Sequence, residues 1–174
     1  MPYKNIIEPL LGDILLDFGG LSMTRGQQQN RESFYTDIDS YISPIICYES
    51  VYGEYVTKYF NKGYGILAII TNDAWWGNTE GHRQHFSYAK LRAVETRKNI
   101  LRSANTGISG IISSRGDEII RTNYNEESII SANYKENDIV TIYVQFGDYI
   151  YRISLFILII ICSYYFSLII KGKK

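Results

Sequence analysis

The stretch that decides the fold is SPIICYESVYGEYVTKYFNKGYGILAIIT, residues 43–71. Its first apolar run predicts a buried strand over 43–47, and the segment that follows predicts a helix over 49–62. A second apolar run, rich in β-branched residues, predicts a strand over 66–71. In this order of elements, Cys47 lies at the turn from a buried strand into a helix.

The flanking sequence extends this pattern into one α/β domain over residues 1–150. Residues 1–42 are loop-rich, with one short helix expected near 6–16. A loop over 72–81 precedes an amphipathic helix over 82–98, which together with the later hairpin signals predicts a mixed sheet. That helix is expected to carry Phe86, Ala89, Ala93 and Val94 on one face, and the further strands are expected over 100–104, 108–113, 118–122, 128–134 and 139–146.

Composition and charge exclude several classes of protein. The chain has 174 residues, which suits one domain with a real core. Eighteen basic residues balance eighteen acidic ones without long runs of either sign, so nucleic acid is not an expected partner. Cys47 and Cys162 lie in very different surroundings, and no disulfide is expected.

The C-terminal part, residues 151–174, contains a candidate membrane span. Residues 153–170 form an uncharged run of eighteen, about the length that crosses a hydrocarbon core of roughly 30 Å. Lys171, Lys173 and Lys174 follow it and favour a cytoplasmic C-terminus. The alternative is a buried core segment, but such a long uncharged run that stops at a lysine cluster is typical of a membrane span.

Cys47 is the leading candidate for catalysis. A thiol at the start of a helix meets the positive end of the helix dipole, which favours the nucleophilic thiolate. The backbone N–H of Tyr48 is then placed to stabilise an oxyanion. Glu49 is a candidate for orienting a base or a substrate. The alternatives are a buried structural cysteine and a surface glutamate near a helix N-terminus.

The sequence gives little support for a metal site or a phosphate-binding loop. His82 and His85 have the spacing of metal ligands, but no further residue completes a familiar set, so no metal is expected. The sequence GISG at 107–110 lacks the lysine and the helix of a phosphate-binding loop. No cofactor is expected.

Five segments in a fixed order resemble a known family. Over residues 43–147 the chain is similar to the C-terminal half of the carbon–nitrogen hydrolase (nitrilase) domain in bacterial apolipoprotein N-acyltransferases, and the final apolar run agrees with that resemblance. The segments are ICYE at 46–49, TNDAWWG at 71–77, QHFSYA at 84–89, LRAVE at 91–95 and LRSANTGIS at 101–109.

The resemblance implies a fold, a reaction and a location. The fold is part of a nitrilase-like αββα sandwich followed by one C-terminal transmembrane helix, with the domain on the periplasmic face of the bacterial inner membrane. Cys47 attacks the ester carbonyl of a phospholipid acyl donor and forms a thioester. The amine of a diacylglyceryl-modified lipoprotein then accepts the acyl group. Tyr48 and Glu49 match family positions needed for activity.

The segment after the second strand supplies the implied substrate-binding residues. Trp75 and Trp76 suit a wall that faces an acyl chain or the membrane, although paired tryptophans are as often core or interface residues. Asn72 and Asp73 are assigned to substrate binding with them.

The chain also departs from the family pattern. The family's general-base Glu and oxyanion-stabilising Lys precede the cysteine, and no position here matches either one. Met1-Pro2-Tyr3 looks like the end of the pattern that carries that Lys, so Lys4 and Glu8 follow the motif rather than occupy it. The expectation is an N-terminally truncated form, which also explains why no export signal precedes the domain.

Three hypotheses of different classes therefore stay open. The first is part of a lipoprotein acyltransferase, for which a broad apolar groove beside Cys47 is expected. The second is a membrane-tethered nitrilase-type amidase with a small closed polar pocket. The third is a non-catalytic remnant.

Overall fold

The structure is a computed structural model that describes residues 30–37, 39–60 and 65–171. From Arg31 onward the chain forms one compact unit. The helix expected near 6–16 lies outside the described residues.

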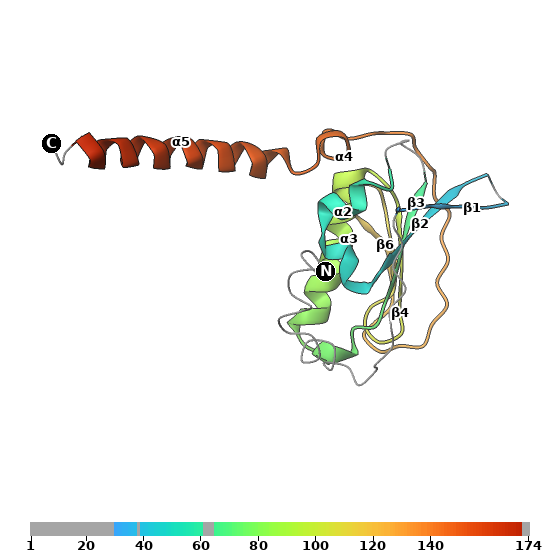
Figure 1. The fold of residues 1–174 in the computed structure, drawn as a ribbon. Coiled ribbons are helices and arrows are strands. Elements are labelled where there is room, and N and C mark those ends of the chain that lie inside the picture. Colours follow the sequence, from blue (N-terminus) through green and yellow to red (C-terminus); the bar gives the residue numbers. More distant parts are fainter. Residues whose placement is uncertain (1–29, 38, 61–64, 172–174) are drawn as a thin grey trace. The chain divides into compact units, whose positions relative to one another are not determined.

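A six-stranded mixed sheet forms the centre of this unit (Figure 1). The strands lie in chain order: the two inner neighbours of β3 run parallel to it, and the other pairs are antiparallel. Parallel neighbours need a crossover connection, which the intervening helices provide. The strands are β1 (Phe34–Tyr35), β2 (Tyr41–Ile46), β3 (Ile66–Thr71), β4 (Ile100–Ala104), β5 (Gly110–Ile112) and β6 (Glu118–Arg121).

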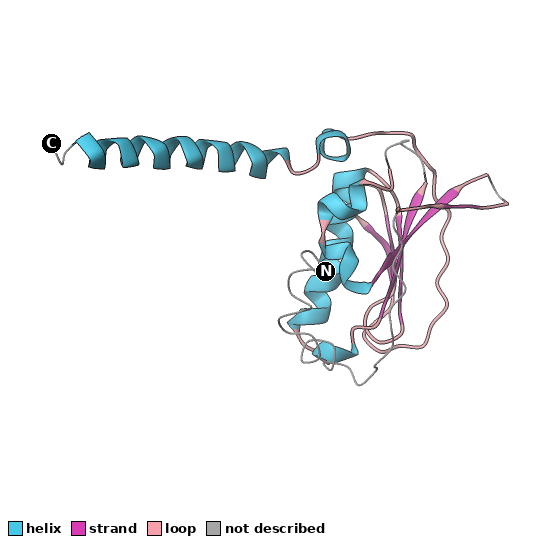
Figure 2. Cartoon of the chain, in the orientation of Figure 1, coloured by secondary structure: helices cyan, strands magenta, loops and turns pink. Residues whose placement is uncertain are grey.

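Helices gather on one side of the strands (Figure 2). The longest is α3, which Thr79 caps by accepting a hydrogen bond from the Gly81 N–H. On its buried face lie Phe86, Ala89 and Ala93, as expected. The helices before the C-terminal one are η1 (Cys47–Val51), α2 (Gly53–Thr57), η2 (Ala74–Trp76), α3 (Glu80–Thr96) and α4 (Ile142–Phe146).

The core lies between the sheet and these helices. The exposure of the side chains alternates along β3 and shows which face of the sheet the helices cover. Ile69 is 1% exposed, whereas its neighbour Ile70 is 53% exposed. Ile46, at the end of β2, is exposed in the same way. The core residues are Ile45, Val56, Phe60, Leu67, Ile69, Phe86, Ala89, Ala93, Ile100, Ile108, Ile112 and Val144.

The prediction of a strand over 139–146 is wrong, since residues 142–146 form the helix α4. Thr141 caps this helix through its side chain, and Gly147 ends it with a φ of 65°. These two end signals outweigh the strand propensity of the residues between them. The strand expected over 128–134 is also absent, because these residues pair with no neighbouring strand.

Two helix predictions need correction. The helix expected over 49–62 is divided into η1 and α2, because Tyr52 has extended backbone angles (φ −89°, ψ 95°). On α3, Val94 is 40% exposed, and Arg92 takes the buried position instead. Arg92 can be buried because its guanidinium pairs with Glu95 at 2.9 Å and donates to the Val51 carbonyl at 3.1 Å.

The C-terminal helix α5 (Tyr149–Lys171) contains the predicted membrane span. It has 23 residues, none of them buried, and it is the one helix in the described part of the chain that is long and apolar enough to cross a membrane. At its start, Arg152 pairs with Glu54 of α2 at 2.6 Å. Length and composition carry the assignment of α5 as a candidate span.

Candidate active site

Cys47 is the first residue of η1, at the sharp turn that follows β2. Its backbone is left-handed, with a φ of 50°, a conformation that costs a non-glycine residue on the order of 1–2 kcal/mol. Such a residue persists only where its surroundings hold it, and it marks functional sites more often than others. The prediction of Cys47 at a strand-to-helix turn is confirmed.

Thr71 holds the sulfur side of Cys47. The register pairs Ile46 with Ile70, so the parallel strands β2 and β3 bring their ends together at this point. As a result, Thr71 Oγ1 lies 3.2 Å from Cys47 Sγ. The same oxygen lies 2.9 Å from Asp73 Oδ1.

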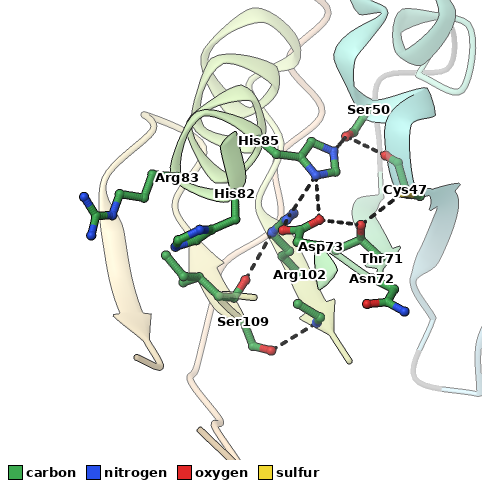
Figure 3. A network of polar contacts seen from close by, with 12 residues as sticks. Cys47, Ser50, Thr71, Asn72, Asp73, His82, Arg83, His85, Arg102 and Ser109 are labelled. Carbon is green, nitrogen blue, oxygen red and sulfur yellow. Dashed lines mark hydrogen bonds and ion pairs between the residues drawn. The ribbon is translucent and has the colours of Figure 1, made fainter. Parts of the chain in front are cut away.

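Ser50 and His85 hold the backbone side of Cys47 (Figure 3). Ser50 Oγ donates to the Cys47 carbonyl at 2.8 Å and lies 3.1 Å from His85 Nε2. The other ring nitrogen, His85 Nδ1, lies 2.8 Å from Asp73 Oδ1. Polar contacts therefore form a closed ring from the Cys47 sulfur through Thr71, Asp73, His85 and Ser50 back to the Cys47 carbonyl.

Asp73 is fully buried and is the charged centre of this ring. Arg102 of β4, itself buried, donates from Nη2 to Asp73 Oδ2 at 2.5 Å. Burial alone raises the pKa of the Asp73 carboxyl, but the hydrogen bonds from His85 and Arg102 outweigh it and lower that pKa below its ordinary value. Gly107 packs against this carboxylate with a φ of 126°, and a Cβ there would lie 2.8 Å from Oδ2.

The other predicted site residues lie around the turn, mostly on the surface. Tyr48 is 51% exposed, and its ring lies 6.4 Å from Trp76 between centroids. Trp75 is 71% exposed, and Asn72 is also exposed. Glu49 accepts from the Ile46 N–H at 2.9 Å and from the Tyr55 hydroxyl at 3.1 Å, so it braces the nucleophile turn.

The sequence pattern predicts no role for three residues of this network, Thr71, Ser50 and Arg102. It suggests a fourth residue, His85, only as a metal ligand together with His82. In the structure His82 contacts the Gly77 carbonyl instead. The described residues contain no cluster of three His, Cys, Asp or Glu able to hold a metal.

Comparisons with known proteins agree on a family. The carbon-nitrogen hydrolase family profile matches residues 21–142. An apolipoprotein N-acyltransferase of Wigglesworthia glossinidia brevipalpis is 33% identical over 99% of this chain and 33% of its own length. That of Rickettsia prowazekii is 37% identical over 74% of this chain and 26% of its own length. The chain therefore spans about a third or less of the length of these relatives.

Solved structures show the same fold. A carbon-nitrogen hydrolase from Helicobacter pylori matches with a TM-score of 0.51 at 16% identity, over 60% of this chain and 43% of that one. An amidase from Nesterenkonia sp. also matches with a TM-score of 0.51, at 15% identity, over 76% of this chain and 49% of the amidase. The sheet and its helices thus follow the nitrilase-like fold.

The buried Asp73 carboxylate predicts a specific dependence of stability on pH. Its lowered pKa contributes stability that is present above the unfolded-state pKa of about 3.9 and is lost as the pH falls through and below that value. Asp73→Asn removes this component and leaves Arg102 without its buried partner, at a cost of about 3–5 kcal/mol near pH 7. Thermal unfolding in detergent between about pH 7 and 3 measures both effects.

The exposed Asp37 provides the matched control. Asp37→Asn is expected to change the free energy of unfolding by less than about 0.5 kcal/mol. Equal losses from the two substitutions at neutral pH would show that the Asp73–Arg102 pair does not hold the site together.

Proposed function

Because this chain belongs to the carbon–nitrogen hydrolase family, we propose that it carries the cysteine nucleophile of an apolipoprotein N-acyltransferase. The observation that carries the proposal is the strained turn at Cys47, a partly exposed residue whose sulfur contacts the hydroxyl of Thr71. The chain spans only part of its relatives, so the complete reaction is proposed for the longer protein.

The proposed chemistry is two acyl transfers through one thioester. The Cys47 thiol ionises and attacks the ester carbonyl of a phospholipid, a C–S bond forms, and the C–O bond breaks as the leaving oxygen of the lysophospholipid takes up the proton that the thiol lost. The amine of a diacylglyceryl-cysteine lipoprotein then attacks the thioester. A C–N bond forms, the C–S bond breaks, and the proton that the amine loses restores the Cys47 thiol. A thiolate suits this role because it is both a good nucleophile and a good leaving group.

Tyr48 and Glu49 are proposed to support the nucleophile. The Tyr48 N–H follows Cys47 directly, where a backbone donor is suited to stabilise the oxyanion of each tetrahedral intermediate. Glu49 is proposed to act by holding the turn, because both of its carboxylate oxygens are occupied by donors at Ile46 and Tyr55.

An exposed aromatic surface on the segments that follow β2 and β3 supports an acyl-chain substrate. Tyr48, directly after Cys47, is 51% exposed and lies beside Trp76, and Trp75 is 71% exposed, whereas Ile46 and Ile70 lie on the uncovered face of the sheet. Exposed apolar groups at a site favour an apolar ligand or a membrane surface. We assign Trp75, Trp76 and Asn72 to this surface. Asp73 is buried, and it is instead proposed to support the nucleophile through its contact with Thr71.

This surface favours the acyltransferase over a membrane-tethered amidase. A small amide needs an enclosed site lined by a few fixed polar groups. The exposed side chains on the segments that follow β2 and β3 include Tyr48 and Trp75, which are large and aromatic. Partners of the proposed reaction are therefore a phospholipid donor, a lipoprotein acceptor and the membrane that contains both.

The proposed location is the bacterial inner membrane, with the domain on the periplasmic face. The candidate span α5 ends at Lys171, and Lys173 and Lys174 follow it in the sequence. Lysines collect on the cytoplasmic side of membrane spans, so the domain before α5 belongs on the opposite side.

Reporter fusions test this orientation. The host protein is the Wigglesworthia relative with its matching third replaced by this chain. Alkaline phosphatase, which is active only outside the cytoplasm, is expected to be active when fused after Asp148 and inactive when fused after Lys174. High activity at both fusion points would contradict a span by α5.

Complementation of an acyltransferase-depleted bacterium tests the nucleophile. The same chimera is expected to restore growth, while its Cys47→Ala variant fails because no thioester can form. Cys162→Ala is the matched control, since Cys162 lies within α5, and it is expected to restore growth fully. Immunoblots of the membrane fraction confirm equal amounts. Growth with Cys47→Ala would exclude Cys47 as the nucleophile.

A further inference from the structure

The hydroxyl of Thr71 has two possible acceptors for its one proton. Thr71 Oγ1 lies within hydrogen-bond distance of both Cys47 Sγ, at 3.2 Å, and Asp73 Oδ1, at 2.9 Å. A hydroxyl has one proton, so it donates to only one of these two groups at a time. An ionised carboxylate and a thiolate are both acceptors only, and they compete for that proton.

Asp73 does not depend on Thr71 for its hydrogen bonds. His85 Nδ1 contacts Oδ1 at 2.8 Å, and Arg102 Nη2 donates to Oδ2 at 2.5 Å. With both oxygens occupied by donors, the carboxylate stays satisfied when the Thr71 proton turns away. Leaving a buried acceptor unsatisfied would otherwise cost about 1–3 kcal/mol.

The charges near the sulfur allow a thiolate at this point. Asp73 alone would disfavour a second negative charge, but Arg102 forms a buried ion pair with it. His85 of α3 faces Asp73, and Glu49 of η1 is turned to the Ile46 N–H and the Tyr55 hydroxyl. Among the described residues the neutral hydroxyl of Thr71 is therefore the side-chain donor placed at the sulfur.

We propose that Thr71 is a catalytic residue whose hydroxyl donates to the Cys47 thiolate and turns to Asp73 when the sulfur is protonated or acylated. His85 is a positioning residue, because it occupies Asp73 and so leaves the Thr71 proton free for the sulfur. Thr71 keeps its proton throughout, and only the acceptor of its hydrogen bond changes. This role rests on the proposed function of Cys47 as a nucleophile.

The pH profile of Cys47 alkylation tests the proposal. The 174-residue chain, carrying Cys162→Ala so that Cys47 is its one thiol, reacts with iodoacetamide between about pH 6 and 10, and mass spectrometry follows the modification. Thr71→Val removes a donor to the thiolate, so the midpoint of the profile is expected to rise by about one pH unit. Thr71→Ala is expected to shift it equally, and Thr71→Ser to restore the original midpoint.

Thr96→Val is the matched control. Thr96 is also a buried threonine, but its hydroxyl donates to the Arg92 carbonyl within α3, so its loss is expected to leave the midpoint unchanged. An unchanged midpoint in Thr71→Val and Thr71→Ala, or an equal rise in Thr96→Val, would overturn the proposal.

Combining substitutions tests whether His85 acts through Thr71. His85→Ala is expected to raise the midpoint, because Asp73 then competes more strongly for the hydroxyl proton. Added to Thr71→Val, it is expected to cause no further rise, whereas an independent structural effect would add. An additive rise would overturn the positioning role. This assay needs no acyl substrate, so a failed complementation alone would refute the proposed function and leave the Thr71 contact standing.

Discussion

The buried contact between Asp73 and Arg102 is the interaction on which the rest of this site depends. A carboxylate without exposed surface is stable only when donors surround it, and here they come from β4 and α3. Thr71, at the end of β3, adds a hydroxyl on the side that faces Cys47. One charged group thus ties together the sheet, the long helix and the nucleophile turn.

This arrangement relates fold to chemistry in a simple way. Parallel strands end at the same edge of a sheet, so Cys47 after β2 and Thr71 at the end of β3 become neighbours. The left-handed backbone of Cys47 is then held from both sides, by Thr71 at the sulfur and by Ser50 at the carbonyl. Rigid support of this kind keeps a reacting group in place without reorganisation during the reaction.

Sequence reasoning predicted the parts of the molecule that depend on local pattern. Apolar runs located β2, β3 and β4 closely, and the amphipathic period located α3. It failed at 139–146, where Thr141 and Gly147 act as helix ends around residues of high strand propensity. Sequence reasoning did not predict the polar ring, because the contacts of His85 with Asp73 and Ser50 follow from tertiary packing rather than from spacing in the sequence. The roles proposed for Tyr48, Glu49, Trp75 and Trp76 stay predictions.

The central claim is that Cys47 carries an acyl group in a thioester, and trapping that intermediate tests it most directly. The chimera is incubated with phospholipid in the absence of a lipoprotein acceptor, digested, and analysed by mass spectrometry. The account predicts one acyl chain on the peptide that contains Cys47, removed by neutral hydroxylamine as expected of a thioester. An acyl chain on any other residue, or an unmodified Cys47 in a chimera that supports growth, would contradict it.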